Sequence, residues 1–301
     1  MKLPTTLSYD ALGTRFFIEI HNELTLEQTK VITGDIKHLL YQFEKRYSRF
    51  LFDSLVSTLN RERTIVNPDQ EFSTLLEYGR RLFTRTEGLF NMLIGSTLED
   101  RGYDSAYSFV PDVTKESVYP NPLTDIAISP TAITLHAGNL DFGGFGKGYV
   151  IDLLATYLKS THDLKYFLIN GGGDVYATSY HDKPFVIYLE HPLEADTYLG
   201  TTEILNQGFA ASSPHKRRWV YKGTTYTHIV DTKQHTIKQA LYDASFIIAH
   251  TCVEADAFAT IALMVTTNEL TQLAIENELA FATFSNPSKL LTNGAFIVHS
   301  L

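Results

Sequence analysis

The sequence contains very little sulfur and no long apolar run. Of its 301 residues only Cys252 is a cysteine, which excludes disulfides within the chain and thiol-rich metal sites. Cys252 lies in an apolar run, so we expect a buried small side chain rather than a nucleophile. The N-terminus lacks the apolar core of a signal peptide, and no run approaches the length of a membrane span. These absences predict a cytoplasmic protein without a membrane anchor.

The chain also lacks an excess of basic residues. Lys and Arg number 25 against 34 Asp and Glu, so the formal net charge is -9. This balance disfavours general binding to nucleic acid, because no net field attracts its phosphates. What is present is the composition of a folded protein, with 44% hydrophobic residues, 19 Phe and 17 Tyr. We expect one or two domains with a large core.

Helical periodicity dominates the first third of the sequence and strand patterns dominate the rest. Capping boxes at Thr25/Gln28 and Thr266/Glu269 mark two helix starts. Predicted helices cover residues 25–47, 71–85, 254–265, the segment after Gly148 and the segment after Thr266. Predicted strands cover residues 14–21, 132–136, 165–169, 185–190, 244–249, 280–284, 295–299 and a hairpin of 217–221 with 225–230. Residues 111–130 form the most loop-like stretch. The pattern predicts an α+β fold, with no clear run of βαβ units.

Residues 140–154, LDFGGFGKGYVIDLL, place four glycines and a lysine before a helix. The spacing fits neither the P-loop nor the dinucleotide fingerprint G-x-G-x-x-G. Backbone N–H groups at a helix N-terminus favour anions, and Lys147 adds a point charge. The stretch alone leaves two interpretations open, an anion cradle and a purely structural turn.

Three further groups of residues carry chemistry. Asp256 and Thr260 are spaced i, i+4, so on a helix their oxygens share one face. Such a pair of hard oxygen ligands is suited to Mg²⁺. The alternative is that the two residues only cap the helix and compensate its dipole. His228 and Asp231 could form a base with its orienting carboxylate, although a chain with 11 His holds such pairs by chance. The run from Asn170 to Asp174 is either a bulge-rich turn or a wall for a ligand.

Read in order, five blocks resemble the FAD:protein FMN transferases, the ApbE-type flavin transferase family. They are residues 13–16, residues 48–60, residues 141–152, residues 170–174, and residues 228–231 followed by 255–260. The resemblance covers nearly the whole chain. It implies an ApbE-like fold of mixed or antiparallel sheets flanked by helices, with a ligand cleft between two lobes. It also implies a single domain over residues 1–301, or two lobes with a loop-rich boundary near 111–130.

The resemblance implies an enzyme that binds FAD, cleaves its pyrophosphate with Mg²⁺ and transfers FMN to a Thr or Ser of an acceptor flavoprotein or FMN-binding domain, releasing AMP. The implied Mg²⁺ ligands are Asp256, Thr260 and the backbone carbonyl of Gly146. His228, Asp231 and Lys147 match the catalytic positions. The implied cofactor contacts are Phe50, Asn91, Asp141, Gly144, Lys147, Gly171, Gly172, Asp174 and Ser212.

The sequence departs from the family pattern at several of these positions. Gly146 stands where Ala is usual and Phe50 where Tyr is usual. Thr232 stands where Pro usually follows Asp231, and Asn91 where Asp is common. Two alternatives stay open. One is a Mg²⁺-dependent FAD pyrophosphatase that gives FMN and AMP, with water as the acceptor. The other, suggested by the altered residues after Asp231, is a non-catalytic FAD-binding protein.

Overall fold

The fold was examined in a computed structural model, which describes residues 3–115, 119–180, 183–230, 232, 240–287 and 289–298. The chain divides into two compact units. Unit 1 comprises Met1–Glu44, Phe145–His215 and Ala240–Leu301, and unit 2 comprises Lys45–Gly144 and Lys216–Gln239. Residues 111–130 therefore lie inside unit 2, and the glycine stretch spans a division between the units.

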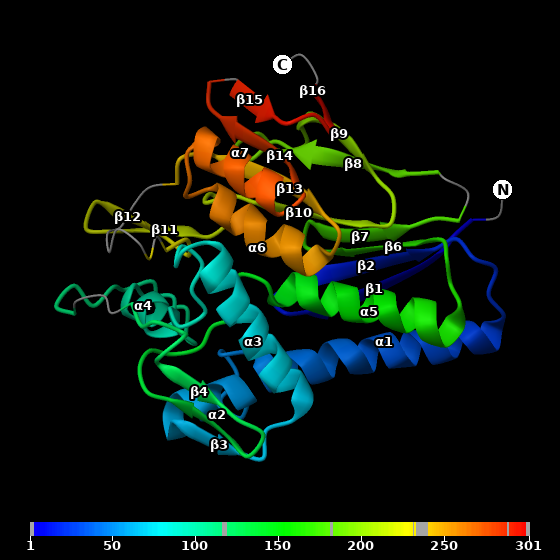
Figure 1. The fold of residues 1–301 in the computed structure, drawn as a ribbon. Coiled ribbons are helices and arrows are strands. Elements are labelled where there is room, and N and C mark those ends of the chain that lie inside the picture. The colour runs from blue at the N-terminus through cyan, green and yellow to red at the C-terminus, as the bar shows by residue number, and fades with distance from the viewer. Residues whose placement is uncertain are drawn as a thin grey trace. The chain divides into compact units, whose positions relative to one another are not determined.

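Unit 1 is built on a fully antiparallel sheet, in which eight strands can be described (Figure 1). Their order is β1-β2-β6-β7-β10-β13-β14-β15. Their bounds are β1 Thr5–Ala11, β2 Thr14–Ile20, β6 Phe167–Gly171, β7 Asp174–Thr178, β10 Gln207–Ser212, β13 Ala244–Ala249, β14 Ala280–Ser285 and β15 Lys289–Thr292. A second antiparallel sheet has the order β16-β9-β8, with bounds β8 Phe185–Glu190, β9 Tyr198–Ile204 and β16 Phe296–Val298.

The large sheet is covered on both faces, and this explains its apolar strands. One face packs against the smaller sheet, through residues such as Phe246, Phe209 and Leu199. Helices α5 (Gly146–His162) and α6 (Cys252–Ala262) contact the sheet and each other. Every residue of β13 is buried, as expected for a strand whose two faces are both covered. Unit 1 also contains α7 (Thr267–Glu276) and most of α1 (Leu26–Tyr47).

Unit 2 combines short helices with small antiparallel pairings. Its helices are α2 Leu55–Glu62, α3 Gln70–Arg85 and α4 Gly95–Asp100. One sheet has the order β3-β5-β4, with bounds β3 Thr64–Val66, β4 Ile126–Ile128 and β5 Ala132–Leu135. A hairpin pairs β11 Arg218–Tyr221 with β12 Thr224–Thr227. The buried cluster of unit 2 is largely aromatic, and its members include Tyr103, Trp219 and Tyr226.

Local signals in the sequence predict local structure correctly. The Thr25 N–H donates to Gln28 Oε1 at 2.9 Å, and the Gln28 N–H donates back to Thr25 Oγ1 at 3.1 Å. The capping box at the start of α7 also forms. The β11–β12 turn has Lys222 and Gly223 at φ 48° and 82°, the positive values of a two-residue hairpin. The buried Cys252 is confirmed as well.

Two parts of the sequence interpretation need correction. The loop-like stretch 111–130 contains the strand β4, because its partner β5 supplies the pairing that the short apolar run lacks alone. Strands β1, β3, β7, β9, β10 and β15 and helices α2 and α4 were also not predicted. β10 reads QGFAAS, with one aromatic and no β-branched residue, so composition gives no strand signal. Within the described residues, no helix combines the length and apolar character needed to cross a bilayer.

Candidate functional site

The first turn of α5 in unit 1 is the centre of the candidate site. The helix begins at Gly146, and its N-cap residue Phe145 offers no side-chain hydrogen bond. The first N–H groups of a helix lack partners within the helix. Here the third of them, on Gly148, donates to Asp256 Oδ2 at 2.9 Å. A carboxylate from α6 therefore occupies the end of α5 where the helix dipole favours negative charge.

Lys147 joins two buried carboxylates at this turn. Its Nζ donates to Asp256 Oδ1 at 2.9 Å and to Asp174 Oδ2. The Asp174 and Asp256 side chains are 2% and 7% exposed, whereas that of Lys147 is 27% exposed. The three residues come from β7, α6 and α5. Unit 1 thus brings together three of the predicted site residues that are far apart in the sequence.

The electrostatics of this cluster favour one more positive charge. Burial raises the pKa of Asp174 to about 7, and the neighbouring charge of Asp256 adds to the rise although Lys147 opposes it. Burial alone would lower the pKa of the Lys147 ammonium, but the two carboxylates outweigh burial and raise it. With both carboxylates ionised the cluster carries one net negative charge. An added cation would stabilise that state.

The predicted glycines before Asp174 form the tight turn that presents it. Gly171 ends β6 and pairs with Asp174 at the start of β7. Gly172 and Gly173 link the strands at φ 72° and 103°, values that favour glycine. A Cβ on Gly172 would lie 2.4 Å from Thr14 Oγ1. Backbone geometry therefore accounts for these glycines, and their role as ligand contacts stays a prediction.

The cluster fits Mg²⁺ by the chemistry of its donors. Among the described residues, no group of three or more His, Cys, Asp or Glu could hold a metal ion, so a site made of such side chains alone does not form there. Mg²⁺ needs fewer side chains, because it keeps waters and binds substrate phosphates. Asp256, Asp174, the Thr260 hydroxyl one turn along α6 and the Gly146 carbonyl are all hard oxygen donors. The buried excess of negative charge is the observation that favours a cation here.

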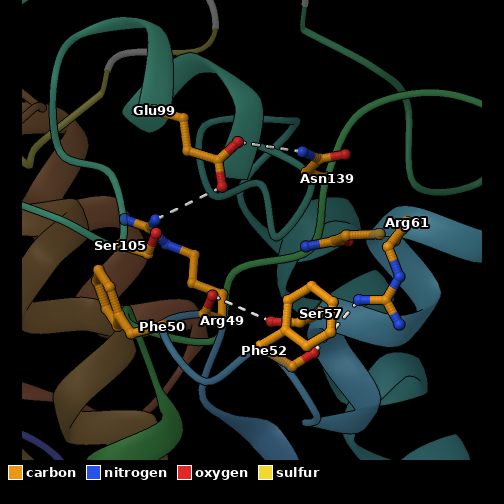
Figure 2. Close-up of a pocket in the computed structure, with 9 residues that line it drawn as sticks. Arg49, Phe50, Phe52, Ser57, Arg61, Glu99, Ser105 and Asn139 are labelled. Atoms are coloured by element: carbon orange, nitrogen blue, oxygen red, sulfur yellow. Dashed lines mark hydrogen bonds and ion pairs between the residues drawn. The ribbon is translucent and has the colours of Figure 1, made fainter.

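Unit 2 contains a pocket around Phe50 and Arg49 (Figure 2). Its volume is about 330 Å³. The lining residues are Arg49, Phe50, Phe52, Ser57, Asn60, Arg61, Glu99, Ser105 and Asn139. The Phe50 ring stacks on Tyr107, with centroids 5.1 Å apart and planes 11° apart, and Arg49 Cζ lies 4.2 Å from its centroid. A flavin that stacks on Phe50 would have to share or replace these contacts.

Arg49 is almost completely buried in unit 2. Its side chain is 2% exposed, its Nε donates to Asp141 Oδ2, and its Nη2 donates to the Tyr103 carbonyl at 2.7 Å. Glu99 Oε1 lies 3.8 Å from Nη1, and this nitrogen makes no hydrogen bond. Asp141 also accepts from the Gly143 N–H at 2.6 Å. Asp141, predicted as a cofactor contact, is thus the partner of a buried arginine.

Other predicted cofactor contacts have clear local roles. The Asn91 amide donates to the Pro120 carbonyl at 2.7 Å and accepts from the Leu93 N–H at 2.8 Å. A Cβ on Gly144 would lie 2.9 Å from the Phe90 ring. Ser212 ends β10 in unit 1, opposite Ser245. As ligand contacts, these three residues stay predictions.

The predicted catalytic histidine lies just after β12 in unit 2. His228 Nδ1 is 3.2 Å from the Arg217 carbonyl oxygen, and its ring centroid is 6.5 Å from that of Tyr103. Asp231 lies outside the described residues. The proposed His228–Asp231 pairing therefore stays a prediction.

Sequence reasoning did not single out two residues that shape these sites. Asp152 on α5 accepts hydrogen bonds from the first two N–H groups of α6, and Arg49 is a buried cation of unit 2. A signal for Asp152 was available, because it follows Gly148 by four residues and shares its helix face. Arg49 gives no comparable signal, since its partner Asp141 is distant in the sequence.

Comparison with known proteins identifies the family. The model of the ApbE family matches residues 12–283, most of the chain. The chain belongs to the ApbE family. The resemblance inferred from the sequence is therefore confirmed, and the motifs of this ApbE protein lie within the matched region.

Curated relatives of this ApbE protein carry a common name. The FAD:protein FMN transferase of Chlamydia pneumoniae is 23% identical over 270 residues, covering 85% of this chain and 83% of that protein. The FAD:protein FMN transferase of Vibrio cholerae is 23% identical over 271 residues, covering 84% and 79%. The one from Rhodobacter capsulatus is 25% identical over 179 residues, covering 55% of this chain and 33% of that protein.

Solved structures show the same fold. The ApbE protein of Thermotoga maritima has a TM-score of 0.83 at 20% identity, covering 97% of each chain. The flavinyl transferase ApbE of Pseudomonas stutzeri has a TM-score of 0.82 at 19% identity, covering 98% of this chain and 97% of that one. The predicted fold class, α+β with an ApbE-like fold, is confirmed.

Proposed function

We propose that this ApbE protein is a Mg²⁺-dependent FAD:protein FMN transferase. It cleaves the pyrophosphate of FAD, attaches FMN through a phosphoester to a Thr or Ser of an acceptor flavoprotein, and releases AMP. The enzyme class is the one that the curated relatives carry in their names. The observation that carries the proposal is the cluster of Lys147, Asp174 and Asp256 at the first turn of α5.

The cluster has the parts that transfer of a phosphoryl-linked group requires. Such reactions depend on positioning and charge neutralisation more than on covalent help from the protein. When bound, Mg²⁺ neutralises charge on the pyrophosphate. Asp256, Thr260, Asp174 and the Gly146 carbonyl are the groups that would hold it. The N-terminus of α5 and the Lys147 ammonium stabilise negative charge on the phosphates.

The remaining steps are assigned to residues of unit 2. His228 takes the proton from the acceptor hydroxyl as its oxygen attacks the FMN phosphorus, with Asp231 orienting the imidazole. A positioned general base of this kind contributes roughly 10²–10⁴-fold to the rate. The Phe50 ring offers a π face to the flavin. The identity of the acceptor and the cytoplasmic location stay predictions.

A transfer assay tests the proposal. The protein is incubated with FAD, Mg²⁺ and an FMN-binding acceptor domain, and covalent flavin fluorescence on the acceptor is measured together with AMP. We expect labelling and AMP in equal amounts with the wild type. We expect a loss on the order of 100-fold or more in Asp256→Ala, at least the loss typical of residues that only support a metal ligand.

The same assay separates the two alternatives. Free FMN and AMP without labelled acceptor would identify a pyrophosphatase. Tight FAD binding without AMP release would identify a binding protein. Lys165→Ala, which removes an exposed lysine of unit 1, is the matched control and should retain wild-type labelling.

A further inference from the structure

Each of the helices α5 and α6 carries a carboxylate that accepts hydrogen bonds from the first turn of the other helix. Asp256 of α6 accepts from the Gly148 N–H of α5 at 2.9 Å. In return, Asp152 of α5 accepts from the Cys252 N–H at 2.9 Å and from the Val253 N–H at 2.8 Å. Each helix therefore supplies the negative charge that the N-terminus of the other favours.

The first turn of α6 is fully hydrogen-bonded by this arrangement. Asp152 takes the N–H groups of the first two helical residues, and Thr251 Oγ1 takes that of Glu254 at 3.4 Å. The Ala255 N–H donates to the Thr251 carbonyl at 3.2 Å, which begins the regular helical pattern. The two caps differ in origin. Thr251 precedes the turn in the chain and caps it locally, whereas Asp152 belongs to α5 and connects the turn to that helix.

Two glycines bring the backbone of unit 1 close around the same turn. A Cβ on Gly148 would lie 2.4 Å from the Cys252 carbonyl oxygen, and a Cβ on Gly208 would lie 2.4 Å from the Cys252 nitrogen. Cys252 is thus enclosed by α5 on one side and β10 on the other. Asp256 follows Cys252 by four residues, so it lies on the same face of α6 one turn later. A shift of the first turn would move Asp256 with it.

We propose that Asp152 is a positioning residue, which fixes the first turn of α6 against α5 and thereby holds Asp256 at Gly148 and Lys147. Its importance for metal binding rests on the proposed function; its effect on the Gly148–Asp256 hydrogen bond does not. Burial raises the pKa of Asp152 to about 6 despite the two N–H donors, in keeping with a carboxylate enclosed between the helices.

The test compares Asp152→Asn with Thr251→Ala in the full-length protein. Both variants remove a cap of α6, but only the first loosens the link to α5. Hydrogen exchange of the Gly148 amide reports on its bond to Asp256. We expect exchange about tenfold faster or more in Asp152→Asn, the effect of losing a hydrogen bond to a charged group. We expect Thr251→Ala to leave the rate near that of the wild type.

Mn²⁺ binding, followed by the loss of the free-ion EPR signal, gives a second readout. We expect the Mn²⁺ dissociation constant to rise about 10–100-fold in Asp152→Asn, as for other residues that orient a metal ligand. Equal exchange rates at Gly148 in the two variants would overturn the proposal. If the wild type binds no Mn²⁺, the metal assignment fails, whereas the exchange comparison still decides the role of Asp152.

A further variant covers the case in which Asp152→Asn does not fold. Asp152→Glu keeps the charge but lengthens the side chain by one methylene, so it disturbs the register of the two helices without removing the cap. Faster Gly148 exchange in Asp152→Glu than in Thr251→Ala supports the positioning role. An unchanged rate contradicts it.

Discussion

Each compact unit has a cation that contacts carboxylates, Lys147 in unit 1 and Arg49 in unit 2, but the surroundings of the two cations differ. In unit 1, Lys147 contacts two carboxylates, and the more exposed of them is only 7% exposed. In unit 2, Arg49 contacts the nearly buried Asp141, whereas its second acidic neighbour, Glu99, is 3.8 Å away and 39% exposed. Aromatic rings surround Arg49 instead.

The difference separates two kinds of binding site. In unit 1, the buried Asp174 and Asp256 give an excess of negative charge when both are ionised, which burial makes costly and a divalent cation would relieve. In unit 2, Arg49 pairs with Asp141 and lies beside the rings of Phe50 and Tyr103, and such ring faces suit a flat aromatic group. The proposed metal role therefore falls to the carboxylate pair of unit 1, and the proposed flavin role to the aromatic pocket of unit 2.

The largest expected effect is the loss of the cation in unit 1. Lys147→Met leaves Asp174 and Asp256 without their ammonium partner, so we expect the free energy of unfolding to fall by about 3–5 kcal/mol. Denaturant titration measures it. The control Lys165→Met removes a pair with Asp163 whose side chains are 61% and 83% exposed, and should change stability by about 0.5 kcal/mol or less. Equal losses in both variants would contradict the assignment.

Removal of the Arg49 charge in unit 2 should lower the free energy of unfolding by somewhat less. Arg49→Met leaves Asp141 buried, although the Gly143 N–H still donates to it, so we expect a loss of about 3 kcal/mol. Added Mg²⁺ should restore part of the loss in the lysine variant of unit 1 but none in Arg49→Met. A Mg²⁺ effect of the same size in both would remove the distinction between the units. Arg61→Met, at a more exposed pair with Glu62, is the matched control.

Two glycines of the same stretch sharpen the comparison. In unit 1, a Cβ at Gly148 meets the Cys252 carbonyl at 2.4 Å, whereas in unit 2 a Cβ at Gly144 meets the Phe90 ring at 2.9 Å. Backbone atoms move less readily than an aromatic ring. We therefore expect the free energy of unfolding to fall by about 2–3 kcal/mol in Gly148→Ala and by about 1 kcal/mol in Gly144→Ala. Thermal unfolding at matched pH measures both. The reverse order would show that the α5–α6 contact is not rigid.

A further expected effect concerns pH. The ordinary pKa of the Asp152 carboxyl is 3.8, and burial raises it to about 6 in the folded protein. Its contribution to stability is therefore fully present below pH ~4 and is lost as pH rises through about 6, an effect of roughly 3 kcal/mol over that whole range. The stability difference between wild type and Asp152→Asn should shrink between pH 4.5 and 7.5. Parallel urea midpoints across this range would show that the pKa is not raised.

Features with a local cause were predictable from the sequence. The capping boxes at Thr25 and Thr266 and the hairpin turn at Lys222-Gly223 all depend on neighbouring residues, and all form. The Asp256 and Thr260 spacing also placed both residues on one helix. The spacing could not show that Asp256 accepts a hydrogen bond from the N-terminus of another helix, α5. The interpretation as dipole compensation therefore named the right interaction but the wrong helix.

Features that depend on distant pairing were not predictable from the residues alone. Asp152 and Cys252 are 100 positions apart, and Lys147 and Asp256 are 109 apart. No periodicity in the sequence records such contacts. β10 was missed for the same reason, because Gly208 is required by the nearby backbone of Cys252 and not by strand propensity. It was the resemblance of the five motifs, taken in order, to the ApbE family that indicated that Lys147 and Asp256 belong to one site.

The assembly of unit 1 from three separate stretches of chain has a consequence for biosynthesis. β2 pairs with β6, from Phe16 opposite Gly171 to Ile20 opposite Phe167, so the ribosome releases β2 long before its neighbour exists. A lone hairpin of β1 and β2 is marginally stable in water and carries an open edge. Residues 45–144, which supply most of unit 2, emerge in between. We therefore expect the part of the chain that is made first to be among the last to become fully structured.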